Sequence, residues 1–291
     1  MAAPIDAVGA KSSSTNILIR RIISYTVLTI FAFLALFPFF LLIIQMTRSS
    51  VEINQGFKPI PGGSFWENFK TVMNNNNWRM LKALRNSLIV SGLTAFLSTY
   101  FSALTAYAIH VYDFKLRKFL FTFILMIMMV PAQVSALGFV RLVTDMGLTN
   151  SYIPLVIPSI AAPATFFFMK QYMESSLPLD IVEAARIDGS GEFRTFNSLI
   201  LPILKPAIAV QAIFTFVSSW NNFFIPALIL DDPDKKTLPI VIQIIRSQDL
   251  ASLDLGAVYV AIGISIVPVA VVYLILSKFI IRGIALGAVK G

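Results

Sequence analysis

The chain has 291 residues, of which 57% are hydrophobic and only 13% are charged, with a formal net charge of +8. Soluble domains contain roughly 45–50% apolar and about 25% charged residues, so this composition excludes an ordinary soluble domain. The sequence has no cysteine and one histidine, His110, which excludes a disulfide framework, a thiol nucleophile and a metal site built from these residues. The positive charge is typical of basic loops in a membrane protein, and no nucleic-acid partner is expected.

The hydrophobic residues gather in six blocks long enough to cross a bilayer. About 20 apolar residues in a helix span the ~30 Å hydrocarbon layer, and lipid offers the backbone no other hydrogen-bond partners. The sequence therefore predicts an all-α, polytopic membrane protein with six transmembrane helices. In chain order they are Ile22–Met46, Leu84–His110, Phe119–Val140, Tyr152–Met173, Ile203–Leu230 and Val258–Ile281.

The segments around these blocks define the expected organisation. A polar segment, 1–21, precedes the first block, which is too long for a signal-peptide core and is expected to remain as a span. The transmembrane domain then covers 22–281, and a tail follows at 282–291. Aromatic residues recurring in the long loop 47–83 indicate short helices there, and a second long loop covers 231–257.

Basic residues set the expected orientation. The short segment 111–118 holds Lys115, Arg117 and Lys118, whereas basic residues of the opposite side are spread over the long stretch from Arg48 to Arg85. Because basic density in short loops faces the cytoplasm, both termini are expected to be cytoplasmic. Prolines lie within several spans and mark either packing irregularities or hinges that let a pathway open. These are Pro38, Pro131, Pro158, Pro163, Pro226 and Pro268.

The cytoplasmic loop 174–202 carries the most informative pattern. Asp180 followed by Glu183 predicts a capped helix start, and Asp188-Gly189 predicts a helix end with a left-handed glycine. A second helix is expected from near Ser190, carrying Phe193, Phe196, Leu199 and Ile200 before Pro202. Apolar side chains on a cytoplasmic loop indicate a surface that docks into another protein.

These residues resemble a known motif in register. Glu183-Ala184-Ala185, Asp188-Gly189, Phe196 and Leu201-Pro202 are similar to the EAA loop of binding-protein-dependent ABC importer permeases. The resemblance implies a type I permease bundle in which the loop docks into an ATPase subunit. It assigns this coupling role to the following residues: Glu183, Ala184, Ala185, Asp188, Gly189, Phe196 and Pro202.

The same resemblance implies the partners. They are a second homologous permease, an ATPase dimer, an extracytoplasmic solute-binding protein and membrane lipid, in the bacterial plasma membrane. The chain has no phosphate-loop motif, so no cofactor is expected on it, and ATP and Mg²⁺ would bind the partner ATPase. No catalytic residue and no metal site are expected.

Other segments resemble the maltose and multiple-sugar branch of these permeases, in particular its shorter partner. They are the stretch from Ser219 to Phe223, Thr237-Leu238-Pro239 in the last outer loop, and the terminal 287–291. In that branch the tail reaches between the ATPase subunits and the last outer loop touches the sugar-binding protein. The resemblance implies a carbohydrate cargo, such as an oligosaccharide.

Polar residues in the fifth span are candidates for the translocation path. Gln211, Thr215, Ser218 and Asn222 recur at helical spacing and so share one face; uncharged polar groups suit sugar hydroxyls. The same face equally suits interhelical hydrogen bonds, and the partner permease is an alternative holder of the sugar. The full candidate set is Gln133, Gln211, Thr215, Ser218, Trp220, Asn221 and Asn222.

Features of the sequence bear on three rival functions. An ion-coupled secondary transporter needs ionisable residues at mid-membrane, and the middles of the expected spans have none. An intramembrane enzyme would need a metal motif, a cysteine, or a histidine within a span to activate a nucleophile. The sequence has none of these. An ABC permease for a non-sugar solute stays open, because the EAA-like loop does not specify the cargo.

Overall fold

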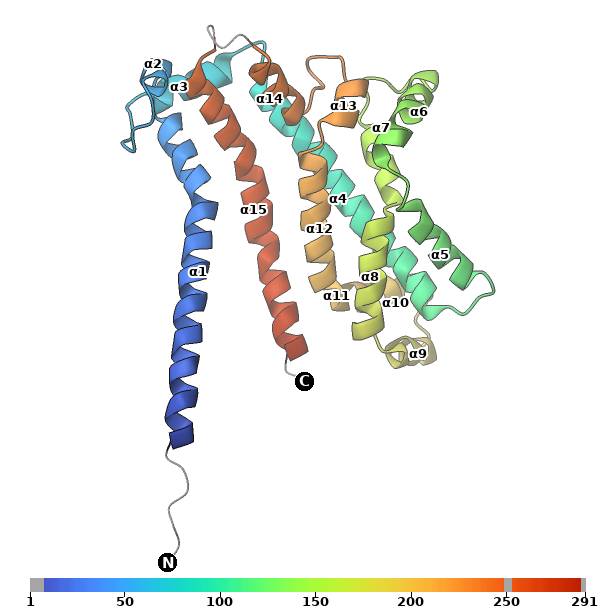
Figure 1. Cartoon of the computed structure of the whole chain (residues 1–291). Helices are drawn as coiled ribbons and strands as arrows, with labels where there is room; N and C mark the ends of the chain where they lie inside the picture. Colours follow the sequence, from blue (N-terminus) through green and yellow to red (C-terminus); the bar gives the residue numbers. More distant parts are fainter. Residues whose placement is uncertain (1–7, 249–252, 289–291) are drawn as a thin grey trace, which may run out of the picture. The chain divides into compact units, whose positions relative to one another are not determined.

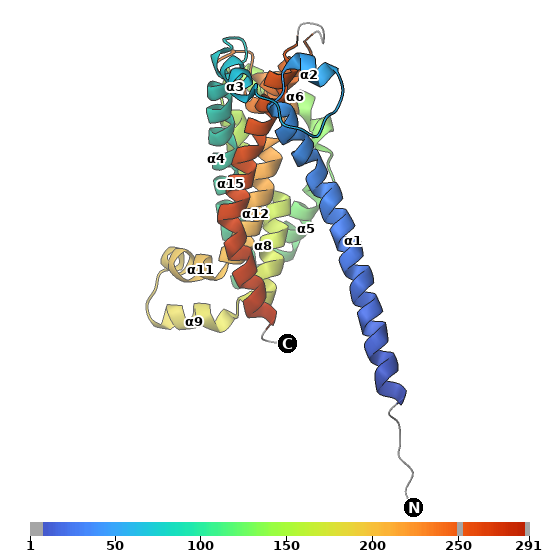
Figure 2. The same ribbon diagram turned by 90° about the vertical axis from the view of Figure 1, so that its left-hand side faces the viewer.

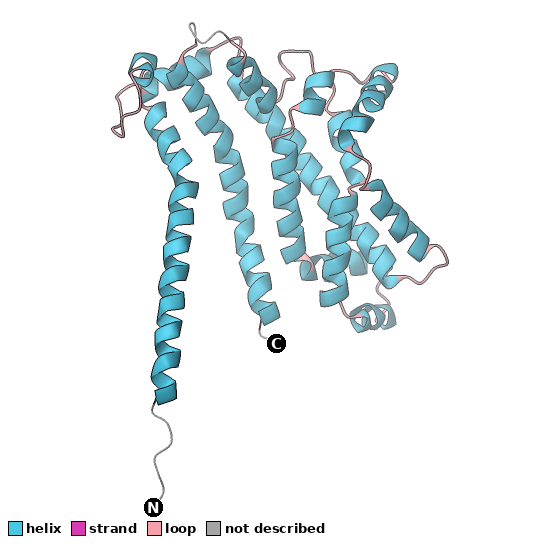
Figure 3. Ribbon diagram, in the orientation of Figure 1, coloured by secondary structure: helices cyan, strands magenta, loops and turns pink. Residues whose placement is uncertain are grey.

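The computed structural model describes residues 8–248 and 253–288. Every regular element in these residues is helical, and none is a strand (Figure 3). This agrees with the predicted all-α class. The chain divides into two compact units, one of residues up to Lys70 with Asp254–Gly263, and the other of Thr71–Leu253 with the residues from Ile264 onward.

The first unit contains a long apolar helix followed by a compact segment of short helices, which we call the cap. Its helices are α1 (Val8–Met46), α2 (Ser50–Asn54) and most of α3 (Phe65–Asn74) (Figure 1). The side chains of residues 17–40 in α1 are all exposed, with Phe31 and Phe33 at 65% and 67%, whereas Ile44 and Gln45 near the end of the helix are buried. A helix that is apolar all round is stable only where lipid or protein covers it, as expected for a span.

Hydrogen bonds organise the cap after α1. Ser49 and Glu52 form a capping box at the start of α2, and Asn68 donates from Nδ2 to the carbonyls of Met46 and Arg48, at 2.9 Å each. Gly256 is required beside them, because a Cβ at this position would lie 2.5 Å from Asn68 Nδ2. The short helices predicted in 47–83 are thus present as α2 and α3.

The second unit holds the remaining helices, and α15 (Leu255–Ala288) passes into it from the first. Its elements in chain order are α4 (Met80–Val111), α5 (Arg117–Ile127), α6 (Ala132–Asp145), α7 (Ile153–Val156), η1 (Ile157–Ile160), α8 (Pro163–Ser176), α9 (Leu179–Ile187), α10 (Glu192–Thr195), η2 (Phe196–Ile200), α11 (Leu201–Ile203), α12 (Lys205–Trp220), α13 (Phe224–Ile229) and α14 (Leu238–Arg246).

Helix α4 is the centre of this unit and packs against α8 and α12. Its buried face is rich in small residues, including Ser98, Ser102 and Ala103. Small side chains let helix backbones approach closely in membrane proteins. Ser98 Oγ lies 3.2 Å from Thr165 Oγ1 of α8, so hydroxyl contacts accompany the close packing.

The membrane-crossing helices agree only in part with the six predicted spans. Among the described residues, four helices are long and apolar enough to cross, and a fifth span arises if the bent pair Glu192–Ile203 and Lys205–Trp220 counts as one. The predicted third span is broken at Pro131 into α5 and α6, of 11 and 14 residues. Each is shorter than the roughly 20 residues needed to cross, so the count of six stays a prediction.

The predicted fifth span is also interrupted. Helix α12 ends at Trp220 and α13 begins at Phe224, with Asn221 and Asn222 in the turn between them. The prediction of a single helix over Ile203–Leu230 was therefore wrong. The chain breaks where two asparagines, which favour turns, precede two phenylalanines.

Short helices gather at both ends of the second unit. Helices α9, α10 and α11 gather beyond one end of α4 and α8, and α6, α13 and α14 gather at the opposite end (Figure 1). At that opposite end Val143, Ile229, Leu230 and Ile240 form a small buried apolar cluster. We call the first the hairpin end and the second the loop end.

Candidate functional site: the 178–206 hairpin

The hairpin comprises residues 178–206; α9 forms one layer, and α10, η2 and α11 follow one another to form the second (Figure 2). Helix α9 begins at Leu179, with Pro178 as its N-cap and no side-chain capping bond. The predicted capping role of Asp180 was therefore wrong: Pro178 is already extended, with φ −64° and ψ 136°, and the helix starts directly after it. Asp180 instead lies in the first turn, where a carboxylate is favoured by the helix dipole.

The end of α9 follows the predicted glycine stop. The Ser190 amide donates to the carbonyl of Ala185 at 2.9 Å, and the Gly189 amide donates to that of Arg186 at 3.0 Å. These two bonds define a Schellman motif. Gly189 has φ +74°, a conformation that glycine adopts without steric cost, so the Asp188-Gly189 pair fixes where the chain turns back.

One face of the hairpin is built into the core of the second unit. Val182 is 1% exposed, and Phe196, Ile200 and Leu204 are fully buried. They share one cluster with residues of α4 and α8, namely Ala103, Ala106, Tyr107, Ile109, Phe166, Met169 and Met173. Burying a large apolar side chain stabilises by about 1.5–3 kcal/mol, so the hairpin is attached firmly to two long helices.

The other face of the hairpin is exposed although it is partly apolar. Ile187 is 86% exposed and Phe193 is 69% exposed. Glu183, Ala184, Asp188 and Gly189 are exposed beside them. We call these six residues the exposed hairpin surface. Apolar side chains gathered in this way indicate a contact surface for another protein.

A polar contact centred on Glu192 joins the two layers to α4. Its carboxylate accepts from Arg186 Nε at 2.7 Å, from the Tyr112 hydroxyl at 2.6 Å and from the Tyr107 hydroxyl at 3.2 Å. The hydrogen bonds from Arg186 and then Tyr112 lower the pKa of Glu192, and burial followed by the bond to Glu192 raises the pKa of Tyr112. Sequence reasoning missed this contact, because Tyr107 and Tyr112 are remote from the hairpin in the chain.

The return layer of the hairpin is locally widened. Residues Phe196–Ile200 form a π-helical turn, and Pro202 follows with no amide hydrogen to donate to the carbonyl of Ser198. The helix axis then bends by 81° between Ile203 and Lys205. Phe196, which is buried, and Pro202, which is exposed, therefore shape the junction with α12. In α9, Ala185 is 5% exposed and packs inward.

The candidate path residues do not form one uniform face. Gln211 is 8% exposed, Thr215 is half-buried and Ser218 is exposed, so these three side chains become more exposed in chain order. Asn222 lies beyond the helix, which means that the predicted shared helical face ends before it. Gln211 lines a cavity of about 300 Å³ with Phe168, Tyr172, Pro206, Ala207, Val210 and Ile280.

Trp220 is a packing residue in this conformation. It is 3% exposed, its ring stacks on Phe216 with centroids 5.6 Å apart, and its Nε1 donates to the Ser265 carbonyl at 3.1 Å. Its ring face is thus already covered by the chain itself. Asn221 and Gln133 are exposed, and Gln133 lies in the first turn of α6 after Pro131.

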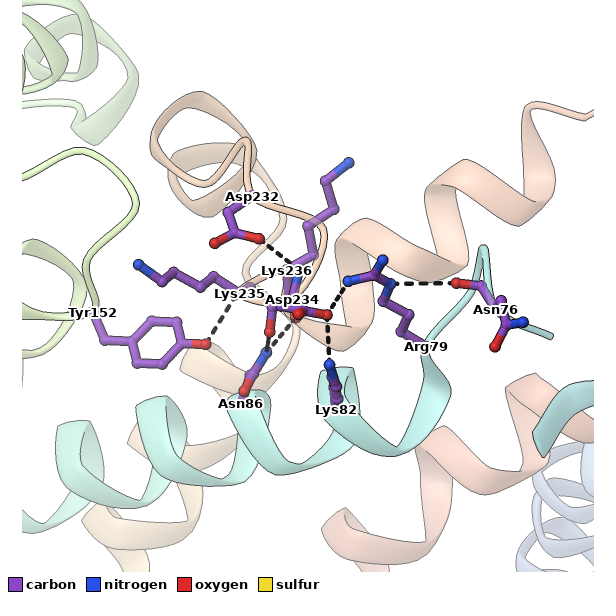
Figure 4. Close-up of polar contacts among 9 residues, drawn as sticks. All are labelled: Asn76, Arg79, Lys82, Asn86, Tyr152, Asp232, Asp234, Lys235 and Lys236. Carbon is purple, nitrogen blue, oxygen red and sulfur yellow. Dashed lines mark hydrogen bonds and ion pairs between the residues drawn. The ribbon is translucent and has the colours of Figure 1, made fainter. Parts of the chain in front are cut away.

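At the loop end, charged and amide groups hold the segment after α13 (Figure 4). Asp234 forms ion pairs with Arg79 and with Lys82, and these bonds lower the pKa of Asp234, with the Lys82 contribution the largest. Asn86 Nδ2 donates to the carbonyls of Asp234 and Lys236 at 2.8 and 3.0 Å. The predicted last outer loop is therefore tied to the start of α4.

Comparison with known proteins places this architecture in a family. Residues 98–286 match the family described as binding-protein-dependent transport system inner membrane component. Because the match covers more than half of the chain, the chain belongs to this family. It is therefore a membrane-embedded transport subunit.

Individual relatives cover nearly the whole chain. The arabinooligosaccharides transport system permease protein AraQ of Bacillus subtilis (strain 168) is 33% identical over 89% of this chain and 92% of its own length. The sn-glycerol-3-phosphate transport system permease protein UgpE of Yersinia pestis is 30% identical over 90% of this chain and 95% of its own length.

A solved structure shares the fold. It is a chain of a bacterial ABC transporter involved in the import of the acidic polysaccharide alginate, with a TM-score of 0.77 at 22% identity. The match covers 95% of this chain and 99% of that one. This chain and that importer chain therefore share their overall fold.

Proposed function

We propose that this chain is a permease subunit of an ATP-binding-cassette importer that carries a carbohydrate, such as an oligosaccharide, across the bacterial plasma membrane. It would have six spans with both termini in the cytoplasm. The α5–α6 break at Pro131 and the α12–α13 break would lie within the third and fifth spans. Non-helical backbone is tolerated at membrane depth where protein or a water-filled path covers it.

The two-faced hairpin carries this proposal. Its inner face shares a core with α4 and α8, while its outer face exposes Ile187 and Phe193. A separate ATPase subunit that grips the outer face would move the helices joined to the inner face. The complex would contain this chain, a second permease and an ATPase dimer. Closure of the ATPase dimer would switch the pathway between an opening to the outside and an opening to the cytoplasm.

The cargo assignment rests on the sugar-type segments and on the arabinooligosaccharide relative. The alternative is an importer for a non-sugar solute, and the relative named for sn-glycerol-3-phosphate supports it. Asn221 and Asn222 are exposed in the break after α12, and Ser218 is exposed within the helix; their uncharged polar groups suit hydroxyl-rich cargo. A solute-binding protein outside the cell would deliver that cargo.

The docking role is tested with charge substitutions on the exposed hairpin surface. Ile187→Glu and Glu183→Lys should leave the protein in the membrane, yet lower both the ATPase co-purified with it and the uptake of radiolabelled arabinooligosaccharide by about tenfold or more, the scale of a contact hot spot. Ile60→Glu, at an isoleucine that is 70% exposed outside the hairpin, is the matched control. Uptake at the normal rate in both hairpin variants would contradict the docking role.

The cargo is tested separately on the unmodified complex. ATP hydrolysis by the complex reconstituted with its binding protein should rise with arabinooligosaccharide and stay at its basal rate with sn-glycerol-3-phosphate. The reverse response would assign the non-sugar alternative and leave the docking role intact.

A further inference from the structure

A basic cavity lies beside the hairpin end, outside the hairpin itself. It has a volume of about 740 Å³ and lies between the end of α4, the loop before α5 and the middle of α8. Its charged lining residues are Asp113, Lys115, Arg117, Lys118 and Lys170. Four cations therefore face one carboxylate, which makes the cavity attractive to an anion.

Most of this positive charge is not neutralised by the chain. Lys170 is buried, pairs with Glu174 and lies 4.8 Å from the centroid of the Phe121 ring. By contrast, Lys115 and Lys118 form no ion pair among the residues that the structure describes. The Arg117 side chain donates to a neutral group, the His110 carbonyl, at 3.3 Å, and forms no ion pair within the described residues.

An unpartnered apolar surface begins directly beside the cavity. Helix α5 starts at Arg117, is apolar after Lys118 except at Thr122, and has no buried residue. Phe119 is 59% exposed, and Phe123 and Ile127, further along the helix, are 45% and 44% exposed. A cationic cavity at one end of an exposed apolar helix matches the two chemical parts of a phospholipid.

We propose that this cavity binds the phosphate headgroup of an anionic phospholipid of the cytoplasmic leaflet, with the acyl chains along α5. The proposal rests on the orientation proposed above, which places loop 111–118 on the cytoplasmic side. Basic pockets between transmembrane helices on that side are suited to anionic headgroups. Lys115 and Lys118 are the principal contacts, because Lys170 is already paired.

The test is native mass spectrometry of the purified full-length chain in detergent, titrated with phosphatidylglycerol or with phosphatidylcholine. Wild type should bind phosphatidylglycerol about tenfold more tightly, and the double variant Lys115→Ala/Lys118→Ala should lose most of that difference, since each basic residue near a membrane surface contributes measurably. Lys115→Arg/Lys118→Arg should retain it. The matched control Lys235→Ala/Lys236→Ala removes two lysines from the loop end and should bind as wild type does.

Several results would overturn the proposal. One is equal phosphatidylglycerol affinity in wild type and in the Lys115→Ala/Lys118→Ala variant, and another is an equal loss in the control. Displacement of the lipid by millimolar inorganic phosphate at constant ionic strength would assign the cavity to a free anion. If the Lys115→Ala/Lys118→Ala variant bound lipid as wild type does but lost its co-purified ATPase, the cavity would be a contact site for the protein partner. Lipid affinity and sugar uptake are measured independently, so a negative result for lipid binding would not contradict the proposed transport function, and the reverse also holds.

Discussion

The hairpin at one end of the second unit and the segment around Asp234 at the other end are held by different interactions, although the loop end also has its own small apolar cluster. At the hairpin end, Val182, Phe196 and Ile200 are buried against two long helices. At the loop end, Asp234 is held by Arg79 and Lys82, with side chains 39–54% exposed. Apolar burial is strong and insensitive to salt, whereas exposed ion pairs contribute little. The hairpin is therefore anchored to α4 and α8 by apolar burial, which its proposed coupling role requires, whereas the ion pairs only hold the segment around Asp234 in place.

The largest expected effect is at Phe196. Phe196→Ala should destabilise the protein by about 3–5 kcal/mol, because it empties a buried aromatic site. Phe193→Ala, at an exposed ring in the same hairpin, should leave the midpoint of thermal unfolding almost unchanged while lowering uptake. Equal shifts in the two midpoints, measured on purified protein, would break the distinction between the buried and exposed faces.

A smaller effect is expected at Gly189. Gly189→Ala forces a side chain into the left-handed region, at a cost of about 1–2 kcal/mol. Gly191→Ala is the matched control, since Gly191 has φ −69° and both glycines have open space for a Cβ. The unfolding midpoint should fall for Gly189→Ala only, and an equal fall in both would remove the backbone explanation.

Protonation of Glu192 should loosen the hairpin. The lowered pKa means that its contacts contribute above the ordinary value of 4.5 and are lost as the pH falls below that value through the folded pKa. In Glu192→Gln, hydrogen exchange of the amides in 188–195 should be about two- to fivefold faster near pH 7 and lose this acid dependence. An unchanged acid response in the variant would show that another group is responsible.

The smallest effect is expected at the loop end. Asp234→Asn should lower the midpoint of thermal unfolding only slightly, and the difference should shrink in high salt. Asp231→Asn is the control, because Asp231 forms no ion pair in the described part of the chain. A loss as large as that of Phe196→Ala would overturn the contrast between the two ends.

Sequence patterns predicted the features that depend on local chemistry. The apolar blocks, the glycine stop at Gly189 and the helical class follow from composition and backbone preference. Pro131 was predicted to mark a packing irregularity or a hinge, but the complete break between α5 and α6 was not predicted, because hydropathy does not report helix continuity. The start of α9 at Leu179, rather than at a cap formed by Asp180, depended on a single extended residue.

Contacts between distant segments were beyond reach of the sequence. The bonds from Tyr107 and Tyr112 to Glu192 join residues about 80 positions apart. Trp220 was predicted as a candidate for the translocation path, whereas in the structure its ring is buried and stacks on Phe216. Which side of α12 is buried depends on its neighbours, and periodicity within one helix does not identify them.

The most direct test of the account is the accessibility of the hairpin in cells. The chain contains no cysteine, so Ile187→Cys introduces a unique thiol at the most exposed hairpin isoleucine. A membrane-impermeant maleimide should leave it unlabelled in intact cells, label it in inside-out vesicles stripped of ATPase, and fail to label it once ATPase subunits are added back. Labelling from outside intact cells, or labelling that added ATPase does not reduce, would contradict a cytoplasmic hairpin gripped by a separate ATPase.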